Sequence, residues 1–179
     1  MKILLHICCA PCLIYPLKRI NDQGFTAKGF YYNPNIYPVD EYNRRKEAVI
    51  ALSKELKIGT ELPEYLPAEF SRAVNANYQA PQRCAGCWRL RLQRTALYAK
   101  ENGFDAFSST LLVSPYQNQD LLKQLGSQVA QECGVDFYYE DFRPGFKQAH
   151  DEARSKGIYC QRYCGCSYSE TERNAKLKK

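Results

Sequence analysis

The cysteines are the residues of this 179-residue sequence whose number and spacing most clearly suggest chemistry. There are nine, and all but Cys133 fall into three groups: Cys8, Cys9 and Cys12; Cys84 and Cys87; and Cys160, Cys164 and Cys166. In a reducing cytosol, grouped thiols indicate metal binding or redox chemistry rather than structural disulfides. An odd number of cysteines also excludes complete disulfide pairing within one chain. We expect the isolated Cys133 to be an inert thiol that packs as a small hydrophobic residue.

Two C-x-x-C motifs, Cys9–Cys12 and Cys84–Cys87, have a spacing that lets two thiolates reach one metal centre. The second motif opens a predicted helix, and a helix N-terminus favours the negative charge of thiolates. With Cys8 as a further thiol, the two groups supply the four ligands of a 4Fe–4S cluster or of a structural zinc ion. A thioredoxin-like dithiol would explain either motif alone, but it would leave the other motif unexplained.

Spacing alone does not distinguish zinc from an iron–sulfur cluster. A structural zinc site is closed by four ligands, whereas at least five thiols are expected to converge here. The C-x-C motif of Cys164 and Cys166 adds more, and a disulfide within so small a ring is strained and easily reduced. A redox pair, two metal ligands and two free thiols are all open interpretations of this motif.

The elements that would position these thiols alternate between strands and helices. The predicted strands are Lys2–Cys8, Thr26–Tyr32, Thr60–Tyr65, Ala106–Ser109 and Val135–Tyr139. The predicted helices are Pro11–Gln23, a helix capped by Asp40 and running to Lys57, Cys84–Glu101, Gln119–Glu132 and Phe146–Lys156. This alternation predicts a single α/β domain over residues 1–179, Rossmann-like, with a mainly parallel sheet and helices on both faces.

Ligands of such sheets bind beyond the carboxyl ends of the strands. Cys8 and Cys9 end the first strand and Asp141 follows the last, so thiol and polar residues gather at one edge. Cys8 and Cys9 can share a metal centre only if the chain turns there, because neighbouring strand residues point to opposite faces. If the backbone stays extended, Cys9 and Cys12 become the better pair. No glycine-rich phosphate loop follows this strand, so no nucleotide cofactor is expected.

Composition restricts the partners and the compartment. The formal charge of +6, from 25 basic and 19 acidic residues, permits a polyanionic partner without requiring one. No apolar run is long enough to span a bilayer, and the N-terminal stretch lacks the apolar core and cleavage site of a signal peptide. We therefore expect a cytoplasmic protein with no membrane partner.

The motifs, taken in order, resemble those of the QueH-type epoxyqueuosine reductases over essentially the whole chain. The matching segments are His6–Cys12, Tyr32–Ile36, Glu41 and Tyr42 with Arg45, Cys84–Cys87, Ser109–Tyr116, Asp141–Arg143 and Tyr159–Cys166. The resemblance implies cobalamin-independent reduction of epoxyqueuosine to queuosine, the last step of queuosine biosynthesis. The substrate would be the wobble position of tRNAs with GUN anticodons, those for Tyr, His, Asn and Asp. An electron donor, which the sequence does not identify, would be a further partner.

The resemblance also implies roles for individual residues. A 4Fe–4S cluster would be held by Cys8, Cys9, Cys84 and Cys87, and a redox-active disulfide would be formed by Cys164 and Cys166. An adjacent single metal ion, iron or zinc, would take a ligand at Cys12, a position where some members carry Asp. Asp141 is a candidate proton donor, as are tyrosines and water, and Cys160 receives no role.

Two functions of other classes stay open at this point. The chain could be a zinc-stabilised RNA-binding module without catalysis, which one equivalent of zinc and no iron would favour. It could also be a thiol–disulfide oxidoreductase acting on proteins, which activity after complete metal removal would favour.

Overall fold

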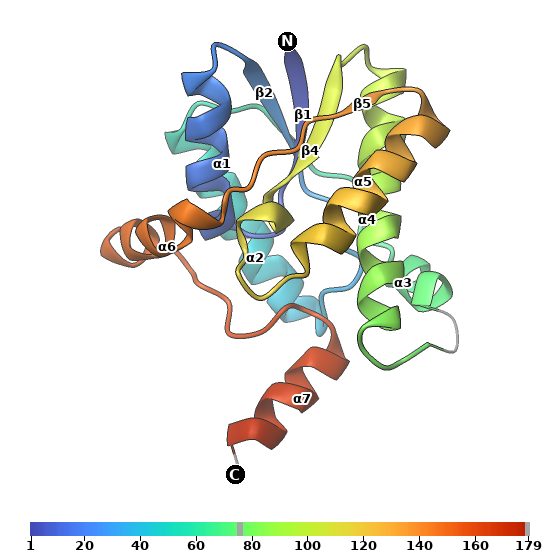
Figure 1. The fold of residues 1–179 in the computed structure, drawn as a ribbon. Coiled ribbons are helices and arrows are strands. Elements are labelled where there is room, and N and C mark those ends of the chain that lie inside the picture. Colours follow the sequence, from blue (N-terminus) through green and yellow to red (C-terminus); the bar gives the residue numbers. More distant parts are fainter. Residues whose placement is uncertain (75–76, 178–179) are drawn as a thin grey trace.

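The computed structural model describes residues 1–74 and 77–177, and within them five strands form one parallel sheet (Figure 1). The strands are β1 (Lys2–His6), β2 (Thr26–Phe30), β3 (Thr60–Glu61), β4 (Ala106–Ser109) and β5 (Asp136–Phe137). Their order is β3-β2-β1-β4-β5, with every neighbouring pair parallel. The predicted α/β fold with a parallel sheet is thus confirmed.

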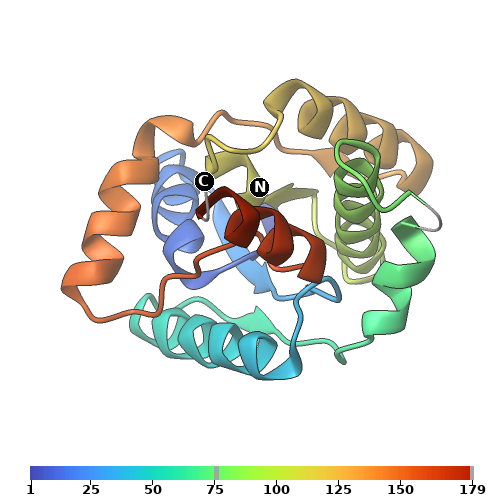
Figure 2. The same cartoon turned by 90° about the horizontal axis from the view of Figure 1, so that it is seen from below.

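Helices cover both faces of the sheet, as predicted (Figure 2). They are α1 (Ala10–Asp22), α2 (Val39–Glu55), α3 (Pro67–Val74), α4 (Gln82–Glu101), α5 (Gln119–Cys133), α6 (Phe146–Ser155) and α7 (Ser167–Leu177), with short 3-10 turns at Thr110–Val113 and Arg143–Gly145. Helices α1 and α2 cover one face, while α4 and α5 cover the other. In the described part of the chain, no helix combines the length and apolarity that crossing a membrane requires.

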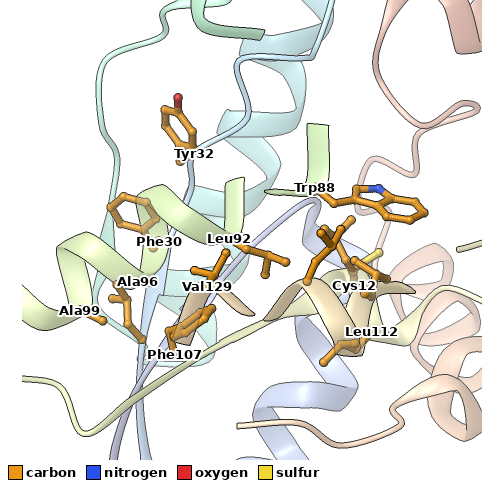
Figure 3. Packing of buried hydrophobic residues seen from close by; sticks show 14 of the residues in the cluster. Cys12, Phe30, Tyr32, Trp88, Leu92, Ala96, Ala99, Phe107, Leu112 and Val129 are labelled. Carbon is orange, nitrogen blue, oxygen red and sulfur yellow. The ribbon is translucent and has the colours of Figure 1, made fainter. Parts of the chain in front are cut away.

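The continuous apolar run of β1 is explained by burial of the strand on both faces. Ile3 and Leu5 contact the α1 and α2 side, and Leu4 contacts the α4 and α5 side. Figure 3 shows the second of these clusters, in which Cys12 lies at one end beside Trp88. The hydrophobic core therefore extends to the edge of the sheet where the thiols were expected.

Several predicted boundaries differ from the observed ones for local reasons. Strand β1 ends at His6 rather than Cys8, because the chain bends at Cys8. The edge strand β3 pairs with only two residues of β2, so it ends at Glu61. The predicted cap by Asp40 is wrong: Pro38 occupies the cap position, and Asp40 lies in the first turn of α2, where its charge suits the helix dipole.

Helices α3 and α7 were not predicted. Helix α3 has eight residues and buries only Phe70 and Val74, which is too few to establish a helical period. Helix α7 buries no residue, so its sequence carries no apolar stripe. Figures 1 and 2 show α7 lying across the carboxyl ends of the strands.

Candidate metal and redox site

The first thiol group lies where β1 gives way to α1. The chain bends at Cys8, and Cys9 precedes the first residue of α1 in an extended conformation. This turn brings the two Sγ atoms to 3.8 Å from each other, so neighbouring residues present their thiols together. A disulfide joins Cys9 to Cys12, and the three Sγ atoms all lie within 4.8 Å of one another. The group can therefore act as one donor set.

The second thiol group lies in the first turns of α4. Cys84 packs against the hydrophobic cluster that contains Cys9 and Cys12, whereas Cys87 is buried with Cys166 beneath α3. Gly86 makes that burial possible, because a Cβ atom there would lie 2.9 Å from the Ala73 carbonyl oxygen. The glycine of the C-A-G-C motif thus allows α3 to approach α4 closely.

The third thiol group is brought to the other two by the segment between α6 and α7. Cys164 is exposed, Cys166 is buried, and the structure records both as free thiols. Gly165 between them has φ +138°, a backbone conformation that favours glycine. Cys164 lines a cavity described below. Within the described residues, neither Cys133 on α5 nor Cys160 lines that cavity. The predicted Cys164–Cys166 disulfide stays a prediction.

A cavity of about 580 Å³ opens beside the thiols, beyond the carboxyl ends of the strands as predicted. Cys8, Cys12 and Cys164 line it, and α6 and α7 contribute to its walls. Its lining includes six cations, which are Arg45, Arg91, Arg154, Arg162, Arg173 and Lys176. The one acidic lining residue, Glu172, is paired with Arg83 outside the cavity. The cavity is therefore suited to an anionic ligand.

Arg91 on α4 is a buried cation whose contacts are unusual. Its Nη2 donates to Asn33 Oδ1 at 2.7 Å, and Asn33 in turn donates to the Ile7 carbonyl oxygen at 2.8 Å. Its Nη1 lies 3.9 Å from Cys87 Sγ. Among the described residues, no carboxylate forms an ion pair with Arg91. A buried cation needs an anion nearby, and the neighbouring Cys87 is a group that becomes an anion when it loses its proton.

Burial opposes that charge as long as no metal is bound. It raises the pKa of Cys87 to about 12 and also raises the pKa of Cys8, while Arg91 acts in the opposite direction on both. A metal ion bound by these thiols would displace their protons, so they would become thiolates in a metal-loaded protein. Thr110 stabilises one of them, because its hydroxyl donates to Cys8 Sγ at 3.1 Å.

His6 is a fully buried core residue at the end of β1. One ring nitrogen is hydrogen-bonded to the Tyr32 carbonyl oxygen and the other to Ser109 Oγ, each at 3.0 Å. Burial and the charge of Arg91 hold its pKa well below the ordinary value, so the ring is neutral.

Asp141 lies outside the cavity lining and forms an exposed ion pair with Arg143. Hydrogen bonds from Arg143 hold the pKa of Asp141 below its ordinary value, so at neutral pH it carries no proton to donate. Sequence reasoning did not single out His150, which lines the cavity with Tyr116 and Tyr163. The spacing of apolar residues along α6 does not identify His150 as a cavity residue, because its position in the cavity depends on how α6 packs against α1.

The residues fit the metal centre that the motifs imply. Thiols come from three separate segments, and the buried guanidinium of Arg91 supplies positive charge next to them. A 4Fe–4S cluster needs four thiols, and Cys8, Cys9, Cys84 and Cys87 would supply that number, with Cys12 beside Cys8 and Cys9.

Comparison with known proteins agrees with this geometry. The sequence model of the family described as epoxyqueuosine reductase QueH matches residues 3–172. The chain belongs to the QueH family. Epoxyqueuosine reductase QueH of Dehalococcoides mccartyi is 41% identical over 178 residues, which cover 98% of this chain and 96% of that protein. QueH of Thermotoga maritima is 35% identical over 182 residues, covering 97% of this chain and 93% of that protein.

A comparison with a solved structure supports only the fold of this QueH chain. The predicted subunit of a tRNA methyltransferase from Methanocaldococcus jannaschii superposes with a TM-score of 0.53 at 10% identity, over 86% of this chain and 74% of that one. The resemblance inferred from the ordered motifs is therefore confirmed at the level of the family.

Proposed function

We propose that this protein is an epoxyqueuosine reductase that converts epoxyqueuosine in tRNA to queuosine. The observation that carries the proposal is a basic cavity lined by Cys8, Cys12 and Cys164 in a member of the QueH family, with Cys84 packed against the cluster that contains Cys9 and Cys12 and Cys87 buried with Cys166. The zinc-stabilised RNA-binding module leaves the exposed Cys164 in the cavity unexplained.

The proposed ligands of a 4Fe–4S cluster are Cys8, Cys9, Cys84 and Cys87, with Cys12 as a ligand to an adjacent iron or zinc ion. When bound, the cluster supplies electrons one at a time. Cys9 and Cys12 are joined by a disulfide here, so that bond must be reduced before either thiolate binds metal. Cobalamin has no part in the proposed reaction.

Removal of the epoxide oxygen to leave an alkene and water consumes two electrons and two protons. Oxidation of the thiols of Cys164 and Cys166 to a disulfide releases the same two electrons and two protons. The pair can therefore store one complete reducing equivalent, and the unidentified donor would restore it. Cys164 lies in the cavity lining, where it can be reached by substrate.

The proposed substrate is the wobble nucleoside of tRNAs with GUN anticodons, those for Tyr, His, Asn and Asp. Arg154, Arg162, Arg173 and Lys176 line the cavity and are placed to contact loop phosphates. Tyr116, which is 84% exposed at the cavity, can stack on an unpaired base. A tRNA substrate supports the proposal that the protein is cytoplasmic.

The decisive experiment combines metal analysis with product analysis. Anaerobically purified protein should contain iron and sulfide, and it should convert epoxyqueuosine in tRNA to queuosine, measured by mass spectrometry of digested nucleosides. Conversion should weaken as salt rises, because phosphate contacts release counterions. Iron-free protein that is folded and active would refute the cluster. Reduced, iron-loaded protein that leaves the epoxide intact with several electron donors would refute the activity.

A further inference from the structure

Glu41 and Arg45, singled out in the sequence, have no role in the function proposed above, and nothing there explains how the segment Tyr159–Cys166 is held in place. The structure joins them. Arg45 and Glu41 on α2 are both buried, with Arg45 Nε donating to Glu41 Oε1 at 2.7 Å. The other carboxylate oxygen, Glu41 Oε2, accepts a hydrogen bond from the Tyr159 hydroxyl at 2.7 Å.

The two terminal nitrogens of the Arg45 guanidinium donate hydrogen bonds to the backbone of the same segment. Its Nη1 donates to the Cys164 carbonyl oxygen and its Nη2 to the Tyr163 carbonyl oxygen, each at 3.1 Å. The guanidinium carbon also lies 5.2 Å from the centre of the Tyr163 ring. The planar fork of one buried arginine thus fixes two consecutive peptide groups immediately before the C-x-C glycine.

Contacts from the loop after β2 hold the other side of the segment. The Tyr37 amide donates to the Gly165 carbonyl oxygen at 2.9 Å, and the Tyr163 hydroxyl donates to the Tyr37 carbonyl oxygen at 2.5 Å. Gly165 fits tightly, because a Cβ atom there would lie 2.9 Å from Asn35 Nδ2 and 3.3 Å from Arg45 Nη1. The peptide at Gly165 is therefore held from both sides.

Stability alone is a poor explanation for this arrangement. A buried ion pair stabilises a fold little compared with apolar residues of the same size, yet it fixes geometry closely. The segment that it holds has no regular secondary structure between α6 and α7, so its path is set by these contacts. That path puts Cys164 in the cavity with Cys8, and Cys166 against Cys87.

We propose that Glu41 and Arg45 are positioning residues that hold the C-x-C thiols of Cys164 and Cys166 against the metal and redox site. The proposal rests on the proposed function for the role of those thiols. The positioning itself depends only on the contacts between α2 and the segment, and it can be measured without turnover.

The test compares Arg45→Met and Gly165→Ala with Val49→Ala, all in the reduced full-length protein. Val49 is buried on α2 but contacts the other hydrophobic cluster, so its variant controls for loss of stability. Two rates are measured by peptide mass spectrometry: tryptic cleavage after Arg162, and alkylation of buried Cys166 by N-ethylmaleimide.

Each variant is measured at the same number of degrees below its own melting temperature. Both rates should then be at least about tenfold higher in Arg45→Met and in Gly165→Ala than in Val49→Ala, because the segment is released. Iron content should stay near that of wild type. If Arg45→Met does not fold, Gly165→Ala decides, because it keeps the buried ion pair. Rates equal to those of Val49→Ala would overturn the proposal, whether or not wild-type protein reduces epoxyqueuosine.

Discussion

Replacing Arg91 by methionine removes a buried charge beside Cys87 while keeping most of the side-chain volume. Its Nη1 lies 3.9 Å from Cys87 Sγ. At an effective dielectric constant of about 20, a unit charge at about 4 Å contributes about 4 kcal/mol to a thiolate. For a charge spread over a cluster, at about twice that distance, the contribution is about 2 kcal/mol.

The sign of the effect follows from the charge. Reduction adds an electron, and a nearby cation favours the more negative state. Loss of the Arg91 charge should therefore lower the reduction potential of the proposed cluster, by about 90 mV for a one-electron couple. Arg91→Lys keeps the charge but loses the fork that binds Asn33, so we expect a smaller shift.

The assay is a redox titration followed by electron paramagnetic resonance, together with iron content. Arg89→Met is the matched control, because Arg89 lies on the same helix and forms an exposed ion pair with Glu132. Exposed pairs of this kind contribute less than about 1 kcal/mol, so its potential and iron content should match wild type. Equal potentials and iron contents in Arg91→Met and Arg89→Met would show that the buried charge has no part in the site.

Three further predictions concern the thiols. Cys84→Ala should abolish bound iron and the associated visible absorbance, whereas Cys133→Ala should leave both unchanged; full iron content in Cys84→Ala would remove that residue from the ligand set. In reduced, metal-free protein, the pKa of Cys87 is about 12, against about 9 for an unfolded thiol, so the folded state holds its proton more tightly. The melting temperature should accordingly fall as pH rises above about 9, more steeply than in Cys87→Ala, and parallel curves would contradict this reasoning. Cys164→Ser and Cys166→Ser should each keep their iron and lose turnover, and a parallel loss of iron would instead make them ligands.

The sheet could be predicted because the residue patterns that produce its strands and the helices between them are local in sequence. Apolar runs such as Ile3–Ile7 are long enough to be strands buried on both faces, and the helices between them have apolar residues at helical spacing. The predicted boundaries are wrong at the ends of the strands, where the apolar runs continue beyond the last residue of the strand. Ile7 is fully buried, so composition gives no sign that β1 has already ended at His6.

Half of the site was predictable for a related reason. Cys8 and Cys84 follow or begin elements whose positions the α/β topology determines, and both were expected at the carboxyl edge of the sheet. The three-residue spacing of Cys9 and Cys12 brings them together within the first turn of α1. These neighbours follow from spacing and topology alone.

The remaining half depends on tertiary contacts that leave no local pattern. Nothing in the local sequence distinguishes Arg91, which lies buried with Asn33 and Cys87, from the surface arginines of the same helix. Arg162 and Lys176 line the cavity, and no local pattern marks them either. Their positions are set by which face of α4 the sheet covers and by the path of the C-terminal segment. That path is fixed by Arg45, which is 119 residues away in sequence, so the position of Cys164 follows from a buried contact rather than from the C-x-C motif itself.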